Sequence, residues 1–144
     1  MLTGMQVANL NAAAGQMLAS GVDFTQSANV SVLQAVAGNL NTSTATGGVV
    51  ILSTITGTTA GGGVVPVCSS SQTITLATGG TVSGQTSKYS PCGSGAGNAA
   101  FNTLIQNLTA GQLIYVAETY YTPQYAWVFA PTGTPSGIYV KAMF

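Results

Sequence analysis

The side chains that are charged at neutral pH are the first places in this sequence where chemistry could occur, and the 144-residue chain has only four of them. They are Asp23, Lys88, Glu118 and Lys141, and there is no His. General acid–base catalysis uses His or carboxylates held close together, whereas these two carboxylates lie far apart in the sequence. Metal sites need clustered ligands, and nucleic-acid binding needs a patch of Lys and Arg. The sequence therefore predicts no enzyme, no cofactor, no metal site and no nucleic-acid partner.

The two cysteines, Cys68 and Cys92, lie in segments rich in Gly and Ser. An even number of cysteines in an uncharged, Thr-rich chain is typical of an oxidising compartment. A disulfide between them would close a loop of about 25 residues, which the chain-entropy treatment values at roughly 3 kcal/mol. The alternative is two unpaired thiols. Because both flanking sequences are typical of exposed loops, we predict the disulfide.

Several polar residues are candidate sites for covalent glycan. Asn29, Asn41 and Asn107 each begin an Asn-x-Ser/Thr pattern. Thr42 and Thr44 lie in a Thr-rich run and are candidates for glycan linked through a hydroxyl. We predict some covalent glycan, because an uncharged exterior needs a solvating layer.

Glu118, the only Glu, lies in an alternating segment that is predicted to be a strand. One interpretation buries it partly and pairs it with Lys141 on the last strand or with a neighbouring subunit, because an unpaired buried carboxylate is costly. The other interpretation is a solvated carboxylate at a sheet edge. The nearby aromatic side chains fit core or interface packing better than a sugar-stacking platform.

The composition constrains what can cover the molecule. Charged residues make up 3% of the chain, against about 25% in typical soluble domains. Yet 46% of the residues are hydrophobic and the mean hydropathy is +0.41, so the chain can bury a core and is not predicted to be disordered. Zero net charge with few charges of either sign favours association. We expect the surface to be covered by other copies, by glycan or by both, the alternative being a secreted β-rich domain kept soluble by Thr, Ser and Asn.

The first 39 residues have the pattern of amphipathic helix. Residues 2–20 lack Pro and are rich in strong helix formers, and Gly21 is a plausible end. Asp23 with Gln26, or Ser27, could cap a second helical segment. We predict two helical segments over 2–39, or one long helix broken near Gly21. The apolar face, which we assign to assembly with other copies, comprises Val7, Leu10, Ala14, Met17 and Leu18.

The rest of the chain favours strands. The β-branched and alternating segments predict strands over 49–56, 64–67, 73–76, 113–121, 126–129 and 138–141. Pro66 argues for an edge position of its segment. Residues 79–98 are predicted to be a loop pinned by the disulfide, and 101–108 a short helix. The expected fold class is α+β, with an N-terminal helical segment over 1–41 and an antiparallel β-rich domain over 42–144.

Three stretches carry a resemblance to known proteins: residues 2–10 (LTGMQVANL), 49–55 (VVILSTI) and 110–121 (AGQLIYVAETYY). With the helix-then-sheet order, they make the chain similar to the TadE-like group of type IV pilin-like subunits. The last stretch resembles the family's Gly-initiated strand, in which a Glu is closely followed by aromatic residues. The resemblance implies a pilin-like fold and a subunit of a filament or surface appendage rather than a catalyst.

The N-terminus bears on export. No apolar run is long enough to span a bilayer, so the chain as written is not predicted to do so. A basic region followed by an apolar stretch, as in a secretory signal, is also missing from the sequence. Pilin-like proteins begin with a leader and an apolar segment with an early Glu. We expect the sequence to be a processed form or to start downstream of the true N-terminus.

These observations together predict a structural subunit of an extracellular helical filament, a homopolymer assembled through the N-terminal helix. In this hypothesis the helix packs against the same helix in other copies and the sheet faces outward. Two alternatives stay open. One is a secreted monomeric domain that binds glycan or a surface through its aromatic residues, and the other is a viral coat or tail subunit.

Overall fold

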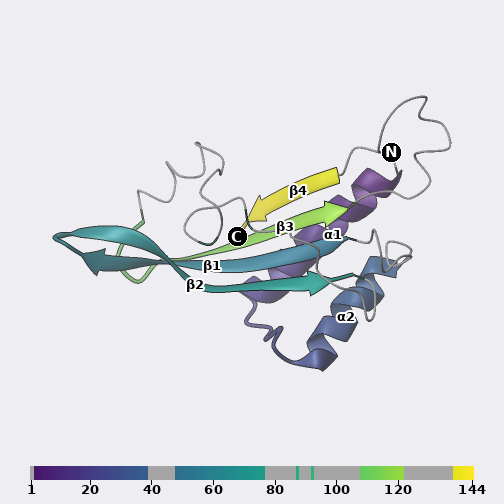
Figure 1. Ribbon diagram of the computed structural model, residues 1–144, viewed down its shortest axis with the longest axis horizontal. Helices are drawn as coiled ribbons and strands as arrows, with labels where there is room; N and C mark the ends of the chain where they lie inside the picture. Colours follow the sequence, from purple (N-terminus) through teal and green to yellow (C-terminus); the bar gives the residue numbers. More distant parts are fainter. Residues whose placement is uncertain (1, 39–47, 77–86, 88–91, 93–107, 122–137) are drawn as a thin grey trace.

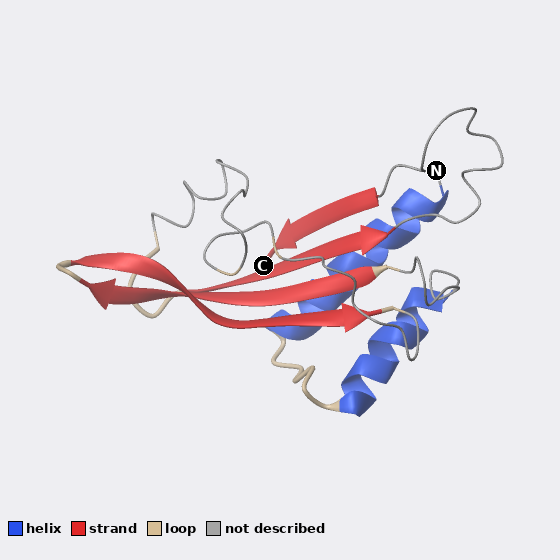
Figure 2. Cartoon of the chain, viewed as in Figure 1, coloured by secondary structure: helices blue, strands red, loops and turns tan. Residues whose placement is uncertain are grey.

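Two N-terminal helices pack on a four-stranded antiparallel sheet, an α+β fold (Figures 1 and 2). The computed structural model describes residues 2–38, 48–76, 87, 92, 108–121 and 138–144. The fold class predicted from the sequence is confirmed, and so is the break near Gly21. The elements are α1 (Leu2–Ala19), α2 (Ser27–Ala37), β1 (Val49–Ala60), β2 (Gly63–Thr75), β3 (Leu113–Tyr121) and β4 (Ile138–Met143).

The sheet has the order β2-β1-β3-β4, so β1 and β3 are central and β2 and β4 form the edges. β1 and β2 are joined by a two-residue turn at Gly61 and Gly62, whose φ angles of 60° and 86° are those that glycine adopts without steric cost. The predicted strand 113–121 is confirmed residue for residue. The predicted strand 126–129 lies outside the described residues, as do the helix 101–108 apart from Leu108 and the loop 79–98 apart from Ser87 and Cys92.

The largest difference from the prediction concerns β2. We expected two short strands, 64–67 and 73–76, whereas the structure has one strand of 13 residues. Continuous pairing with β1 holds it together, and one extra residue, Ser69, is accommodated where the register shifts. Pro66 lies in this edge strand, as its missing N–H requires.

One face of the sheet is covered by the helices. α1 packs mainly on β3 and β4, and the buried cluster between helices and sheet includes Leu10, Leu33, Val50, Ala117 and Tyr121. α1 also approaches the end of the chain closely: a Cβ added at Gly15 would collide with the ring of Phe144. The helices and the sheet therefore share one core.

The opposite face of the sheet has a second, smaller cluster. Ile55 and Val116, on β1 and β3, are buried there together with Leu108. The half-buried Cys92 packs against the same cluster. Both faces of the central strands are therefore covered, which explains why β1 is buried almost continuously over its first half instead of alternating.

The connection between the helices is organised by Asp23. Its Oδ1 accepts hydrogen bonds from the Thr25 hydroxyl (2.6 Å) and the Thr25 backbone N–H (2.9 Å). These bonds, the hydroxyl first, hold the pKa of Asp23 below its ordinary value of 3.8. Gln26, rather than Asp23 or Ser27, is the N-cap of α2, and it makes no side-chain capping bond. Asp23 therefore stabilises the turn before the helix.

At Gly57, β1 lies so close to the residues before β3 that there is little room for a side chain. The Gly57 N–H donates to Gln112 O, and an added Cβ would collide with the backbone carbonyl of Thr109. We expect Gly57→Ala to lower the free energy of unfolding by about 1–3 kcal/mol, because backbone cannot give way as a side chain can. Gly63→Ala is the control in the same hairpin, since nothing lies within 4 Å of its added Cβ. Denaturant unfolding measures both, and equal midpoints for the two variants would contradict this account.

The lowered pKa of Asp23 predicts a pH-dependent contribution to stability. The hydrogen bonds from Thr25 favour the charged carboxylate. Their contribution is present above the unfolded-state pKa and is lost as the pH falls through the lower folded-state pKa, that is below about pH 4. We expect the difference in melting temperature between wild type and Asp23→Asn, which does not titrate, to shrink from about pH 6 to about pH 2. A difference that stays constant over that range would refute it.

Candidate assembly surface and buried carboxylate

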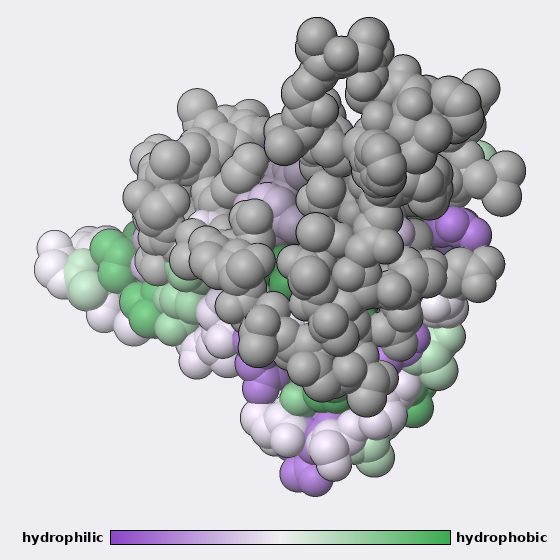
Figure 3. Space-filling model, turned by 45° about the vertical axis from the view of Figure 1, so that its right-hand side comes forward, coloured by the Kyte–Doolittle hydropathy of each residue, from purple (hydrophilic) through white to green (hydrophobic). Residues whose placement is uncertain are grey.

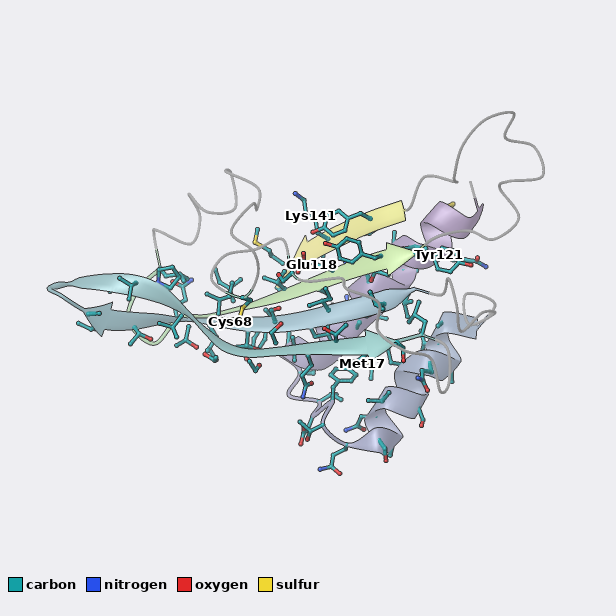
Figure 4. The ribbon with its side chains drawn as sticks, in the orientation of Figure 1. Met17, Cys68, Glu118, Tyr121 and Lys141 are labelled. Atoms are coloured by element: carbon teal, nitrogen blue, oxygen red, sulfur yellow. A yellow bond between two sulfur atoms is a disulfide. The ribbon has the colours of Figure 1, made fainter. Side chains whose placement is uncertain are left out.

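The helix face assigned to assembly is used inside the chain. Val7, Leu10 and Ala14 are 0%, 2% and 0% exposed, and all three belong to the cluster between helices and sheet. Met17 and Leu18 are half-buried and pack against the same cluster (Figure 4). This helix face, the apolar stripe from Val7 to Leu18, therefore packs on the sheet of its own chain. Its contact with other copies stays a prediction.

Other apolar side chains remain exposed on the helices. Met5 on α1 is 67% exposed, and Val32 and Val36 on α2 are 51% and 53% exposed. The two valines are four residues apart and lie on one side of α2. Met5, Val32 and Val36 are therefore exposed apolar side chains of the helices, whereas Val7, Leu10 and Ala14 are buried.

The hairpin of β1 and β2 carries a second exposed apolar group. Val65 and Val67 on β2 and Leu113 on β3 are each at least 40% exposed. Val67 and Leu113 are both cross-strand partners of Thr56, so Val67, Thr56 and Leu113 form one row across the sheet. Figure 3 shows hydrophobic side chains gathered over this hairpin at the left of the view.

Charge is almost absent from the described exterior. Of the charged residues that the structure describes, Asp23 and Lys141 are exposed, and Glu118 is 0% exposed. An exposed apolar group without surrounding charges meets little electrostatic resistance to association. The surface is therefore suited to contact with another uncharged surface.

Glu118 lies on the sheet face opposite the helices, between β1 and β4. Its cross-strand partners are Ile51 and Lys141 (Figure 4). The Ser87 hydroxyl donates to Oε2 at 2.5 Å, and the Tyr139 hydroxyl donates to Oε1 at 2.7 Å. Each carboxyl oxygen therefore has a hydroxyl donor, which offsets the cost of removing the group from water.

The structure rules out one of the two interpretations of Glu118 and leaves the ion pair of the other as a prediction. The carboxyl group is buried in a central strand, so the solvated carboxylate at a sheet edge is wrong. The register places Lys141 directly across from it on β4, with the lysine exposed. The ion pair between Glu118 and Lys141 stays a prediction that this placement favours.

A disulfide joins Cys68 on β2 to Cys92, as predicted, with 5.1 Å between the Cα atoms. Cys92 packs on the cluster formed by Ile55, Leu108 and Val116. Ser87 contacts Glu118, and the disulfide holds Cys92 to β2. These two described residues therefore both lie on the face that holds the carboxyl group.

The candidate glycan sites are only partly described. Asn29 is half-buried on α2, and its Nδ2 donates to the carbonyl of Asp23 at 2.7 Å. Asn41, Thr42, Thr44 and Asn107 lie outside the described residues. The glycan assignments stay predictions, and Asn29 is the one whose amide already has a structural partner.

Sequence reasoning missed the partners that satisfy buried polar groups. Ser87 and Tyr139 were not singled out, because no local pattern connects them to Glu118 across 31 and 21 residues. A further contact joins α1 to β3: the Thr119 hydroxyl donates to Asn11 Oδ1 at 2.8 Å, and both residues are fully buried. The Asn11 Nδ2 group has no hydrogen-bond partner within the described residues.

The described residues offer little reactive chemistry. No three His, Cys, Asp or Glu side chains within the described ranges gather where a metal ion could bind. Glu118 is fully buried from solvent. Neither described helix combines the length and hydropathy that crossing a bilayer requires.

Comparison with protein families, with characterised proteins and with solved structures gives no significant match.

The Glu118 contacts lead to a prediction about stability. We expect Glu118→Gln to lower the free energy of unfolding by about 1–3 kcal/mol, because an amide can accept from only one of the two hydroxyls. Tyr139→Phe removes the donor at Oε1, and the double variant closes a mutant cycle. Denaturant unfolding of the four proteins, with the disulfide intact, measures the coupling. Strictly additive losses would show that Tyr139 does not act through Glu118.

Proposed function

We propose that this chain is a structural subunit of an extracellular filament, built from copies of itself. The observation that carries the proposal is the exterior of the described residues. It exposes large hydrophobic side chains on two helices and a hairpin and bears two exposed charges. Such a surface favours association between copies over a monomeric state in solution.

The burial of the helix stripe changes how the subunits would meet. An assembly through Val7, Leu10 and Ala14 would first require α1 to leave the sheet. Contacts through surfaces that the folded chain already exposes need no such step. We therefore propose that the subunit polymerises as a folded unit, with α1 retained on its own sheet.

The setting of the proposal is extracellular. The disulfide between Cys68 and Cys92 supports an oxidising compartment. Covalent glycan on residues such as Asn41 or Thr42 would solvate the parts of the exterior that other copies leave uncovered. Both features belong to a surface appendage, and the resemblance of three segments to pilin-like subunits supports the same assignment.

Sedimentation and electron microscopy of the purified, disulfide-bonded chain test the proposal. We expect the sedimenting mass to rise above 14.3 kDa with concentration, and ordered polymers to be visible. Because the contacts are apolar, raising the salt to about 0.5 M should not dissociate them. A sharp monomer at millimolar concentration would instead support the monomeric binding domain.

A pair of α2 variants separates the loss of apolar surface from the gain of charge. Val32→Lys with Val36→Lys removes two exposed hydrophobic side chains, whereas Ala28→Lys with Ala35→Lys adds the same charges at other exposed positions of the helix. We expect the first variant to assemble less than the second. Equal assembly would remove α2 from the contact.

A further inference from the structure

The outer edge of β2 is the longest open hydrogen-bonding surface of the described structure. β2 pairs with β1 along its inner side over 12 positions, and no described strand lies beyond it. The N–H and C=O groups of an edge strand that point outward are a template for pairing with another strand. Sheets usually protect such an edge with charged side chains, proline, bulges or a covering element.

The features that protect this edge lie on either side of a short unprotected run. Pro66 and the extra residue Ser69 interrupt the half nearer the hairpin turn. At the other end, the Gln34 amide of α2 donates to the carbonyl of Thr75 at 2.9 Å. Between these two features the run 70–74 is regular, and β2 has no charged residue. The unprotected stretch is therefore short and sharply bounded.

We propose that β2 pairs through residues 70–74 with the same residues of a second copy, antiparallel and across a two-fold axis. The inference rests on the proposed function and identifies one contact of the assembly. An antiparallel edge is complementary to itself under two-fold symmetry, so one surface suffices for both partners. The resulting sheet joins the four described strands of each subunit and continues through both.

A second copy fits this edge better than a foreign strand. The exposed side chains of the run are hydroxyl groups of Ser70, Ser71 and Thr73, so nothing at the edge selects a charged partner. A copy brings the same neutral hydroxyl groups and meets no repulsion. In a polymerising subunit it is also the strand present at the highest local concentration.

The length of the run sets the register. A five-residue segment that pairs antiparallel with itself along its whole length must place its middle residue opposite itself. Gln72 therefore lies opposite Gln72 of the second copy, and Ser71 lies opposite Thr73. Directly opposed side chains have Cβ atoms about 4.5–5.5 Å apart, so charges placed at these positions would interact.

Two charge variants at the same exposed positions test the register. Ser71→Lys with Thr73→Lys places like charges opposite each other in both pairs, and self-association should weaken about five-fold or more. Ser71→Lys with Thr73→Glu places opposite charges there, and association should equal or exceed that of wild type. Both variants remove the same hydroxyls, including the Ser71 contact with Ser53, so thermal unfolding of each is the control for the fold.

The outcomes distinguish this contact from the wider proposal. Added salt should strengthen association of the double-lysine variant by screening the repulsion. Amide hydrogen exchange should slow within residues 70–74 when wild type assembles. If both variants associate like wild type, or if both lose association equally, the pairing is overturned while assembly through other surfaces stands. A monomeric wild type overturns both.

Discussion

The packing of α1 against β3 and β4 is the constraint on which the other features depend. Leu10 and Ala14 complete the core on one side of the sheet, and the missing side chain of Gly15 lets the ring of Phe144 approach the helix. With this face filled by the chain's own helix, the apolar stripe is not a free surface. Among the described residues, the outer helix residues, the hairpin and the strand edges are then the surfaces left for association between folded copies.

The same packing explains why the only Glu lies where it does. The helices cover one face of β3, so the alternation of the strand directs Glu118 to the other face. Cys92, which the disulfide joins to β2, packs on that face too. Burial of the carboxyl group is tolerated because Ser87 and Tyr139 donate to its two oxygens. The disulfide and the carboxyl group thus each hold one described residue, Cys92 and Ser87, against this face.

The local sequence pattern predicts most of the described helices and strands. It fails where contacts between residues distant in the sequence determine the structure. The alternation in 113–121 fixes both the strand and its two faces, and Gly21 marks the helix break. The stripe from Val7 to Leu18 shows that a helix face is buried but not whether its own chain or another copy buries it. β2 was predicted in two pieces because Pro66 and the Ser-rich stretch have weak strand propensity, which pairing with β1 overrides. The hydroxyl partners of Glu118 leave no local signal at all.

The scarcity of charge connects the fold to its proposed use. Charged residues normally keep edge strands apart and folded monomers dissolved, and the described sheet has Lys141 as its one exposed charge. That lysine is on β4. Within the described residues, the opposite edge, β2, is protected by Pro66, a bulge and the contact from Gln34. In a chain selected to stay monomeric, a charged residue within 70–74 would oppose pairing of this edge with another strand. Such a residue would cost the fold almost nothing, because three of these side chains are exposed. Its absence fits a strand whose partner is another neutral strand.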